Sequence, residues 1–230
     1  MKKIIWILVI GGLSLAACKN DPLDITPDGR ITLADVFRDE KHTEAFVNTI
    51  YTSVPEYLWS YYYYSLMAGA SDEARESFVG NGIGDFCEQW NIGNVTPTFN
   101  PMADLFSTGR NTNRYAGFWT GIRNANIFLD EIEGVNFFSA EKTSRLKGEV
   151  RILRAFYYLE LIKQFGPMPI FSSSLAPDFD YSPLTRPTFQ ECVDFIVSDC
   201  DAAIANTDLR LRLNAENERG RVTKAVAYAV

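Results

Sequence analysis

One stretch of the sequence combines aromatic, amide and carboxylate side chains within a segment that has little regular pattern. Trp90, Asn91 and Asn94 lie in the run EQWNIGNVTP, and Asp72 and Glu73 lie upstream of it. Neutral carbohydrates present flat C–H faces and many hydroxyl groups, so they bind to aromatic platforms flanked by amides and carboxylates. These residue types therefore predict a carbohydrate contact and not a charged pocket.

Each of these residues also has a purely structural interpretation. Trp90 could pack against neighbouring helices and keep its loop folded, because large aromatic side chains are usually buried. Asp72 and Glu73 could cap the short segment that follows them. The four consecutive tyrosines Tyr61 to Tyr64 would point in four directions on a helix, so core packing explains them better than a binding site does.

The sequence offers little for catalysis or for metal binding. It contains a single histidine, His42, so neither a clustered metal site nor a Ser/His/Asp arrangement can be assembled, and a lone histidine on a polar helix face is usually solvated. None of the 29 acidic residues stands in a pattern that selects a catalytic pair. A helical glycosidase, with two carboxylates about 5 to 9 Å apart across a cleft, is the enzymatic alternative. We expect no cofactor, no metal and no enzymatic activity.

The charge balance limits the range of partners. The chain carries 22 basic and 29 acidic residues, a net charge of −7, and has no basic run. Nucleic-acid binding needs clustered Lys and Arg, so we expect no nucleic-acid partner. A scaffold that binds a peptide in a helical groove is the alternative from another functional class.

The first 17 residues have the pattern of a secretory signal peptide. Lys2 and Lys3 precede an apolar run, and the sequence LAAC ends at Cys18. The apolar stretch is shorter than the roughly 20 residues that a helix needs to cross a bilayer. The pattern resembles the bacterial lipobox, whose cysteine is acylated with chains such as palmitate; an ordinary signal peptide with an incidental cysteine is the alternative. We expect removal of residues 1–17, lipidation of Cys18 and a tether over residues 18–31.

Residues 32–230 are predicted to form a mainly α-helical domain. Thr32 and Asp35 have the spacing of a capping box, and apolar residues recur with helical period over residues 40–54, with Phe46 and Ile50 in the core. Residues 57–110 contain too many glycines, asparagines and prolines for a regular element, so they are predicted to be a loop-rich insertion.

Two long helices follow, and the short turn between them predicts an antiparallel αα-hairpin. The first should run from Asn113 to a C-cap at Gly134, and the second from Ser139 to Gly166 and Pro167. The predicted inner faces are Tyr115, Phe118, Trp119, Ile122, Ala125, Leu129 and Ile132 on the first helix, and Leu146, Val150, Leu153, Tyr157 and Leu161 on the second. Arg123, Arg151 and Arg154 are predicted to lie on a solvated face and to pair with acids such as Glu149 or Asp130.

A second helix pair begins at a capping box formed by Thr188 and Glu191. Its predicted stripe is Val193, Ile196, Val197, Cys200 and Ile204. Another helix starts at Thr223, and because the chain ends within it, we expect a truncated chain. Helix pairs in series predict a tetratricopeptide-like array with long irregular loops, here incomplete.

The cysteines other than Cys18 show no disulfide framework. Cys192 and Cys200 are eight residues apart on one predicted helix, about 12 Å along its axis, which is beyond disulfide reach. Cys87, Cys192 and Cys200 are therefore expected to be buried apolar residues.

Seven sequence blocks in a fixed order resemble the N-terminal half of the SusD/RagB family of outer-membrane glycan-binding lipoproteins. The blocks are CKNDPLDITPDGRIT, FRDEKHTEAFVNTIYTSV, SDE, FWTGIRNANIFLDEI, LKGEVRILRAFYYLELIKQFGPMPI, RPTFQECVDFIVSDCDAAI and GRVTKAVAYA. The resemblance covers nearly all of residues 18–230. It implies tetratricopeptide-like helix pairs and a surface lipoprotein of the cell outer membrane that binds oligosaccharides or polysaccharides without cleaving them.

The resemblance also implies a partner and a binding residue. Members of the family deliver oligosaccharides to a TonB-dependent outer-membrane transporter of the SusC type, for nutrient uptake. The aromatic sugar contact of the family falls in the stretch that EQWNIGNVTP matches, which makes Trp90 the first candidate, with Asn91, Asn94 and Asp72 as polar contacts. The family is considerably longer than this chain, so a non-functional fragment is a further alternative.

Overall fold

The computed structural model describes residues 32–55, 71–73, 91–94, 96, 114–213 and 218–230. Residues 1–35 and 36–230 form separate compact units, and only residues 32–35 of the first are described. Every regular element within these ranges is helical, which confirms the predicted mainly α fold. The helices are α2 (Leu33–Val36), α3 (Glu40–Tyr51), α5 (Arg114–Glu131), the 3₁₀ turn η3 (Ile132–Gly134), α6 (Ala140–Phe165), α7 (Phe189–Ala205) and α8 (Lys224–Ala229).

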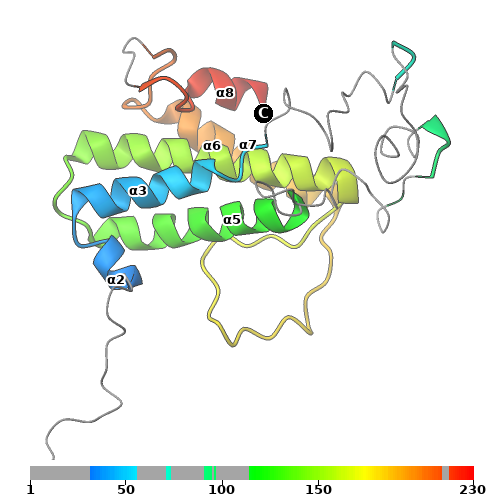
Figure 1. Cartoon of the computed structure of the whole chain (residues 1–230), viewed down its shortest axis with the longest axis horizontal. Coiled ribbons are helices and arrows are strands. Elements are labelled where there is room, and N and C mark those ends of the chain that lie inside the picture. Colours follow the sequence, from blue (N-terminus) through cyan, green and yellow to red (C-terminus); the bar gives the residue numbers. More distant parts are fainter. Residues whose placement is uncertain (1–31, 56–70, 74–90, 95, 97–113, 214–217) are drawn as a thin grey trace, which may run out of the picture. The chain divides into compact units, whose positions relative to one another are not determined.

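Helix α6 is the central element of the larger unit. It packs against α5 on one side and α7 on the other, and α3 lies against both α5 and α6 (Figure 1). Helix α8 packs against α7. The short connection between α5 and α6 makes these two helices antiparallel, which confirms the predicted αα-hairpin (Figure 1).

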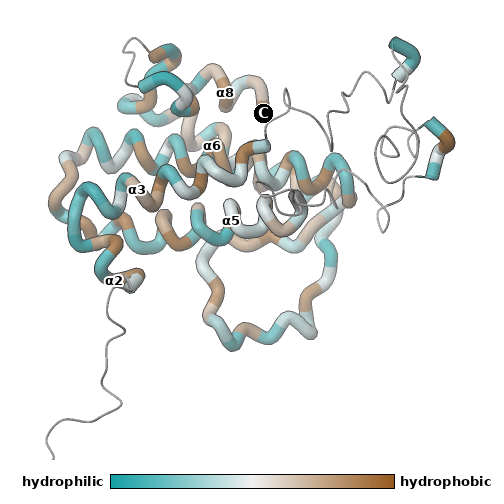
Figure 2. Tube along the Cα trace, viewed as in Figure 1, coloured by the Kyte–Doolittle hydropathy of each residue, from teal (hydrophilic) through white to brown (hydrophobic). Residues whose placement is uncertain are grey.

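The burial of α6 differs from the single inner face that its sequence predicts. All five predicted residues are buried, but so are Ile152, Ala155, Tyr158 and Ile162, which lie on other sides of the helix. Because α6 is covered on several sides, its charged residues Glu149, Arg154 and Glu160 are buried together with its apolar ones. The colouring in Figure 2 shows apolar and polar residues following one another along α3, α5 and α6.

The helix starts follow the predicted local chemistry. The backbone amide of Asp35 donates to the Thr32 hydroxyl at 3.2 Å, and Thr32 donates its amide to the Asp35 carboxylate at 3.0 Å. Ser139 caps α6 by accepting from the Lys142 amide, and Thr188 with Glu191 forms a complete capping box on α7. These caps satisfy amides that have no partner within the helix.

Helix α3 has a cap that the sequence analysis did not identify. Asp39 accepts a hydrogen bond from the amide of His42 at 2.9 Å, and its carboxylate also pairs with the His42 ring. The backbone hydrogen bond, then the ring contact, lowers the pKa of Asp39. His42 is therefore a hydrogen-bond partner of the Asp39 cap, and its side chain is still 44% exposed, so the expectation of a solvated histidine holds in part.

Two further details differ from the predictions. The chain does not stop at Gly134 in a left-handed cap; it tightens into η3, and Val135 is the C-cap. Val197 is 47% exposed and Tyr115 is 37% exposed, although they were predicted on the buried faces of α7 and α5, whereas Cys192 and Ala203 are buried. The buried side of α7 is thus rotated toward Cys192, Ile196 and Cys200.

The predicted cysteine environment is confirmed where the structure describes it. Cys192 and Cys200 are both free and buried on α7. Burial, with the neighbouring Asp199 carboxylate, raises the pKa of the Cys200 thiol to about 11. Cys87 lies outside the described residues.

A close approach between α5 and α6 depends on Gly121. A Cβ atom at this position would lie 2.5 Å from Cε2 of Tyr157 and 3.0 Å from Cβ of Ser53. Tyr157 is fully buried and donates its hydroxyl to the carbonyl of Ile50 at 2.5 Å. Any larger residue at position 121 would force these neighbours apart.

None of the described helices has the length and apolar character needed to cross a membrane. The segment that carries the predicted signal peptide is outside the described ranges.

Candidate functional site

The polar residues predicted to contact sugar hydroxyls are exposed where the structure describes them. Asp72 lies in a bend where the amide of Glu73 donates to the hydroxyl of Ser71 at 3.3 Å. Asn91 and Asn94 flank a turn whose Gly93 has a φ of 71°, in the left-handed region that favours glycine. All three predicted polar contacts have side chains on the surface, as ligand contacts require.

The structure does not describe two of the predicted functional residues. Trp90 and Cys18 lie outside the described residues, as do Tyr61 to Tyr64 and most of the predicted insertion. The sugar platform and the lipidation site therefore remain predictions from the sequence.

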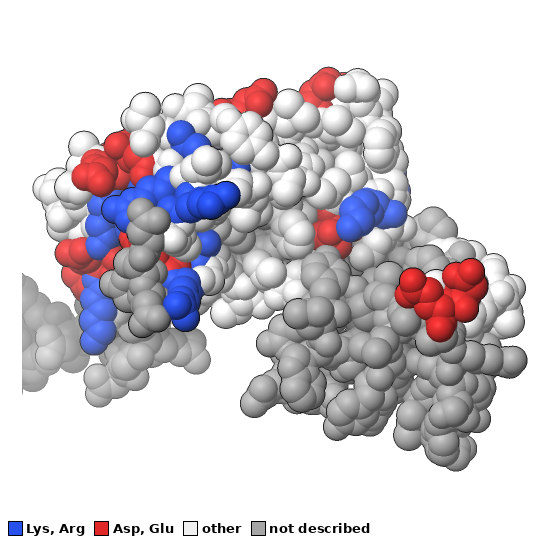
Figure 3. Space-filling view, turned by 90° about the horizontal axis from the view of Figure 1, so that it is seen from above, with Lys and Arg blue, Asp and Glu red and all other residues white. Residues whose placement is uncertain are grey.

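Metal-ligating side chains do not cluster in the part of the chain that the structure describes. Among the described residues, no group of three or more His, Cys, Asp or Glu side chains could hold a metal ion. On the face in Figure 3, basic and acidic side chains are intermingled over the larger unit. The ion pairs of Lys142 with Glu44 at 2.5 Å and Arg210 with Glu218 at 3.2 Å show the same mixing of charges.

The largest departure from the predicted chemistry concerns Arg154. Arg154 was predicted on a solvated face beside Glu149 or Asp130, but it is only 4% exposed and pairs with Asp199 on α7. Its Nε lies 2.7 Å from Oδ2 of Asp199, and its Nη2 lies 2.8 Å from Oδ1. This two-pronged geometry is the strongest arrangement for an arginine and a carboxylate.

Arg154 also contacts α5 and the chain beyond α6. Its Nη1 donates to Oδ1 of Asn126 at 2.6 Å and to the carbonyl of Ser172 at 3.1 Å, and its guanidinium lies 5.1 Å from the ring centre of Phe195. We call Asn126, Arg154 and Asp199 the Arg154 cluster. The cluster joins three helices and satisfies the donors of a buried cation, which a buried charge requires.

The other two arginines have different roles. Arg151, whose side chain is 35% exposed, lies 3.3 Å from Oδ1 of Asp199 and adds a peripheral ion pair. Arg123 is exposed and donates to the carbonyl of Leu175 at 3.4 Å. The acids named as partners, Glu149 and Asp130, were wrong for all three arginines, but Arg123 is solvated as predicted and Arg151 does pair with an acid.

The α6–α7 connection, residues 166–187, is held at its start by side chains of α5 and α6. Asn126 donates to the carbonyls of Phe171 and Ser173 at 2.9 and 3.0 Å, and Asp130 accepts from the amide of Ser174 at 2.7 Å. The amide of Phe171 donates to the Tyr158 hydroxyl at 2.8 Å. Burial raises the pKa of Tyr158 to about 12, so this hydroxyl stays protonated over a wide pH range.

The end of this connection is also held. Arg186 donates to the carbonyl of Phe165, the last residue of α6, at 3.0 Å and to that of Pro167 at 3.3 Å. Since both ends are bound to the helices, the connection has a defined path without regular structure of its own.

A second buried carboxylate lies on α6. Glu149 is 1% exposed, accepts from the Tyr51 hydroxyl at 2.8 Å and pairs with Nη1 of Arg221 at 2.9 Å. We call Tyr51, Glu149 and Arg221 the Glu149 cluster. Burial, followed by the charge of Glu149, raises the pKa of Tyr51. Burial alone would lower the pKa of Arg221, but the charge and hydrogen bond of Glu149 outweigh burial, so the pKa of Arg221 is raised.

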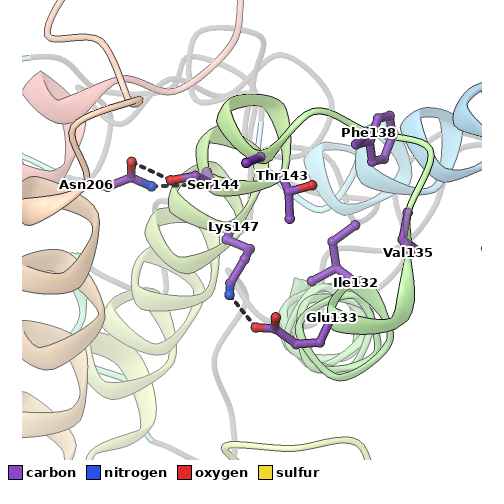
Figure 4. A pocket seen from close by; sticks show the side chains of 9 residues that line it. Ile132, Glu133, Val135, Phe138, Thr143, Ser144, Lys147 and Asn206 are labelled. Carbon is purple, nitrogen blue, oxygen red and sulfur yellow. Dashed lines mark hydrogen bonds and ion pairs between the residues drawn. The ribbon is translucent and has the colours of Figure 1, made fainter.

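A surface hollow of about 460 Å³ lies where the α5–α6 turn meets the chain after α7 (Figure 4). Four of its polar lining residues bind one another: Lys147 pairs with Glu133, and Asn206 binds Ser144 through two hydrogen bonds, as the dashed lines show (Figure 4). Phe138 is the one aromatic residue among the described residues that line the hollow, and it is buried, so the hollow offers no exposed ring on which a sugar could stack and is not our candidate site.

The packed helix pairs define a tetratricopeptide-like helical protein. Comparison with known families identifies the family to which this protein belongs. Residues 35–230 match the model of the SusD-like family described as "Starch-binding associating with outer membrane". The chain belongs to this family, as the seven sequence blocks indicated.

Relatives and solved structures agree with this assignment. A SusD-like protein of Bacteroides ovatus is 22% identical over 100% of this chain and 38% of its own length, and SusD-like protein P25 of Formosa agariphila is 28% identical over 47% of this chain and 20% of its own. A crystal structure of a SusD-like protein from Bacteroides fragilis superposes with a TM-score of 0.61 at 24% identity, covering 91% of this chain and 36% of that one. A laminarin-binding SusD-like protein superposes with a TM-score of 0.66 at 20% identity, covering 83% and 38%.

These structural similarities support the fold. The chain spans less than two fifths of the length of the relatives whose alignment covers most of it.

Proposed function

We propose that this chain binds oligosaccharides or polysaccharides at the bacterial outer membrane, without cleaving them. The observation that carries the proposal is the match of residues 35–230 to a family described as starch-binding and outer-membrane associated. The name of the laminarin-binding relative supports the same ligand class. The acidic chain, with a net charge of −7, favours neutral glycans over polyanions.

We assign Trp90 as the aromatic platform for a sugar ring, with Asn91, Asn94 and Asp72 as hydrogen-bond partners of sugar hydroxyls. Amide groups both donate and accept, and a carboxylate accepts, so the set matches the hydroxyl groups of a neutral sugar. The exposure of Asp72, Asn91 and Asn94 supports this assignment.

The proposal includes an anchor and a receiving partner. Residues 1–17 act as the signal peptide, Cys18 carries the lipid, residues 18–31 form the tether, and residues 32–230 form the helical domain with an insertion over 57–110. The protein then captures glycans at the cell surface and delivers them to a SusC-type TonB-dependent transporter. Replacing Cys18 with serine should abolish incorporation of labelled palmitate and release the protein from the membrane fraction. Retention of the label in that variant would contradict lipidation at Cys18.

Glycan binding is tested by thermal unfolding of residues 18–230, followed by circular dichroism, with and without starch and laminarin oligosaccharides. A ligand that binds only the folded state at 100 times its Kd stabilises it by about 2.7 kcal/mol, so the midpoint should rise with one of these glycans. Trp90→Ala should remove the rise. Ile92→Ala is the control, because Ile92 is a neighbouring side chain that is 64% exposed.

Three outcomes would count against the proposal. A cooperative transition that no glycan shifts would mean that the folded chain does not bind these sugars. A rise that persists in Trp90→Ala would mean that sugar binds elsewhere. Release of new reducing ends during incubation with either glycan would contradict the non-enzymatic role.

A further inference from the structure

The middle of the α6–α7 connection displays one aromatic ring that its helical neighbours do not cover. Tyr181 is 58% exposed, although its backbone is well held. The amide of Phe179 donates to the carbonyl of Ala176, and the amide of Leu184 donates to the carbonyl of Tyr181, both at 3.1 Å. Two successive turns therefore fix the chain on either side of the ring.

A continuous series of ring contacts links Tyr181 to the helical core. Its ring centre lies 5.0 Å from that of Phe179, which lies 6.4 Å from that of Phe171. Phe171 in turn lies 5.8 Å from Trp119 on α5, and Trp119 lies 6.0 Å from the buried Tyr158 on α6. All four contacts are edge-to-face, a favoured geometry for aromatic pairs, so each ring orients the next.

Polar groups flank the exposed ring. The Asp180 carboxylate accepts from both the amide and the hydroxyl of Ser182, at 2.9 and 2.6 Å. Both bonds use Oδ1, and they lower the pKa of Asp180, so the side chain stays ionised at neutral pH. A charged acceptor and a hydroxyl thus lie next to an oriented aromatic ring.

We propose that Tyr181 is a second carbohydrate contact of this protein, in which a sugar ring stacks on the exposed tyrosine and its hydroxyls bind the Asp180 and Ser182 side chains. This contact rests on the proposed function. It lies on the α6–α7 connection, apart in sequence from the site assigned to Trp90. The fixed loop matters because a ligand then loses little affinity to the ordering of its binding partner.

The chemistry of the ligand follows from the surroundings of the ring. The adjacent Asp178 and Asp180 would repel a phosphate or a polyanionic glycan, so a neutral sugar is the better match. A sugar also uses both features at once, because its C–H face packs on the ring while its hydroxyls donate to the carboxylate.

The test is native gel electrophoresis of residues 18–230 in gels that contain soluble starch or laminarin, with Kd obtained from the retardation at several polysaccharide concentrations. Tyr181→Ala should raise Kd about three- to tenfold for the polysaccharide that retards the wild type, as expected for the loss of one stacking contact. Tyr181→Phe should keep most of the affinity because it keeps the ring. Tyr228→Ala is the matched control, since Tyr228 is 67% exposed on α8 and should not alter Kd.

A second variant tests whether the loop must be held in place. Asp130→Ala removes the acceptor for the Ser174 amide at the start of the connection, from an exposed position on α5. We expect a smaller, about twofold, rise in Kd, with recovery in Asp130→Asn, which retains an acceptor oxygen. Circular dichroism should show unchanged helix content in all of these variants.

The outcomes separate this inference from the proposed function. If the wild type is retarded and Tyr181→Ala binds equally well, or Tyr228→Ala weakens binding to the same degree, the Tyr181 contact is wrong while carbohydrate binding stands. If neither polysaccharide retards the wild type, the proposed function fails for these glycans, and the Tyr181 contact fails with it.

Discussion

Asp199 and Glu149 are two acidic residues that are almost completely buried, and they differ in the partners that they hold. Asp199 is 2% exposed and pairs with Arg154, which is 4% exposed. Glu149 is 1% exposed, but the side chain of its partner Arg221 is 22% exposed. The Arg154 cluster is therefore closed to solvent on both sides of the ion pair, whereas the cation of the Glu149 cluster reaches water.

The two clusters also connect different parts of the chain. The Arg154 cluster joins α5, α6 and α7 and holds the carbonyl groups at the start of the α6–α7 connection. The Glu149 cluster joins α6 to Tyr51 at the end of α3 and to Arg221 just before α8. The cost of losing a buried carboxylate depends on the charge left behind, so the two clusters should respond differently to the same kind of substitution.

The largest effect is expected for Asp199→Ala. It leaves the Arg154 guanidinium buried without its counter-ion, which typically costs about 3–5 kcal/mol of unfolding free energy. Urea unfolding of residues 18–230 measures this loss. Asp201→Ala is the control, because Asp201 is exposed on the same helix. Equal stability of the two variants would show that the buried pair contributes nothing.

A smaller loss of unfolding free energy is expected for Glu149→Ala. The Arg221 side chain can turn further into water, so the main penalty is the Tyr51 hydroxyl, which keeps the hydrogen bond from the Val222 amide but loses the acceptor for its own proton, about 1–3 kcal/mol. The same urea titration measures it, with Glu133→Ala as a reference for an exposed acid of a surface pair. A loss as large as that of Asp199→Ala would remove the distinction between the clusters.

Alkaline pH should weaken the Glu149 cluster through Tyr51. The pKa of Tyr51 is raised above its ordinary value of 10 by burial and by Glu149, so the folded state keeps a proton that the unfolded state loses. Stability is therefore full below pH 10 and falls as the pH rises above it, by about 1.4 kcal/mol for this residue at pH 11.

The variant Tyr51→Phe isolates this effect. It should be less stable than the wild type at pH 7 because a hydrogen bond is lost, but its stability should decline less steeply above pH 10. Urea unfolding at pH 7, 9, 10 and 11 measures both effects, with Tyr228→Phe on the exposed surface of α8 as control. An unchanged alkaline slope in Tyr51→Phe would contradict the assignment.

The smallest effect is expected for Arg151→Ala. Arg151 also contacts Asp199, but about a third of its side chain is exposed, and such ion pairs contribute about 0–1 kcal/mol. The loss of unfolding free energy in Arg151→Ala should become smaller with added salt, whereas the loss in Asp199→Ala should persist. A loss above about 2 kcal/mol would show that the periphery of the Arg154 cluster is as important as its centre.

Features that depend on neighbouring residues could be predicted from the sequence, whereas the partners in the two buried clusters could not. Thr188 with Glu191, and Ser139 with the Lys142 amide, act over three residues, so local spacing was enough to predict these caps. The partner of Arg154 lies 45 residues away on another helix, and no local pattern specifies it. One signal was available: Asp199 lies between Ile196 and Ala203 on the apolar side of α7, where an acid needs a buried partner.

Of the candidate binding residues, Trp90 was predicted from the sequence, whereas Tyr181 was recognised only in the structure. The residue types around Trp90 and the seven ordered blocks predicted a glycan-binding family, and the match over residues 35–230 confirms the family. Tyr181 was not predicted, because its sequence surroundings, PDFDYSPL, have no aromatic repeat or period. Only the path of the α6–α7 connection brings its ring into line with Phe179, Phe171 and Trp119.

The sequence by itself determined the helical class, the starts of α2, α6 and α7, and the family, because these depend on period, on capping over three or four residues, and on the order of short blocks along the chain. The tertiary structure decided that α6 is covered on several sides, that Arg154 is buried against Asp199, and that Tyr181 stands on a fixed loop. These features depend on contacts between residues far apart in the chain, where burial sets the energy of each charge and ring, and that burial exists only after the helices have packed.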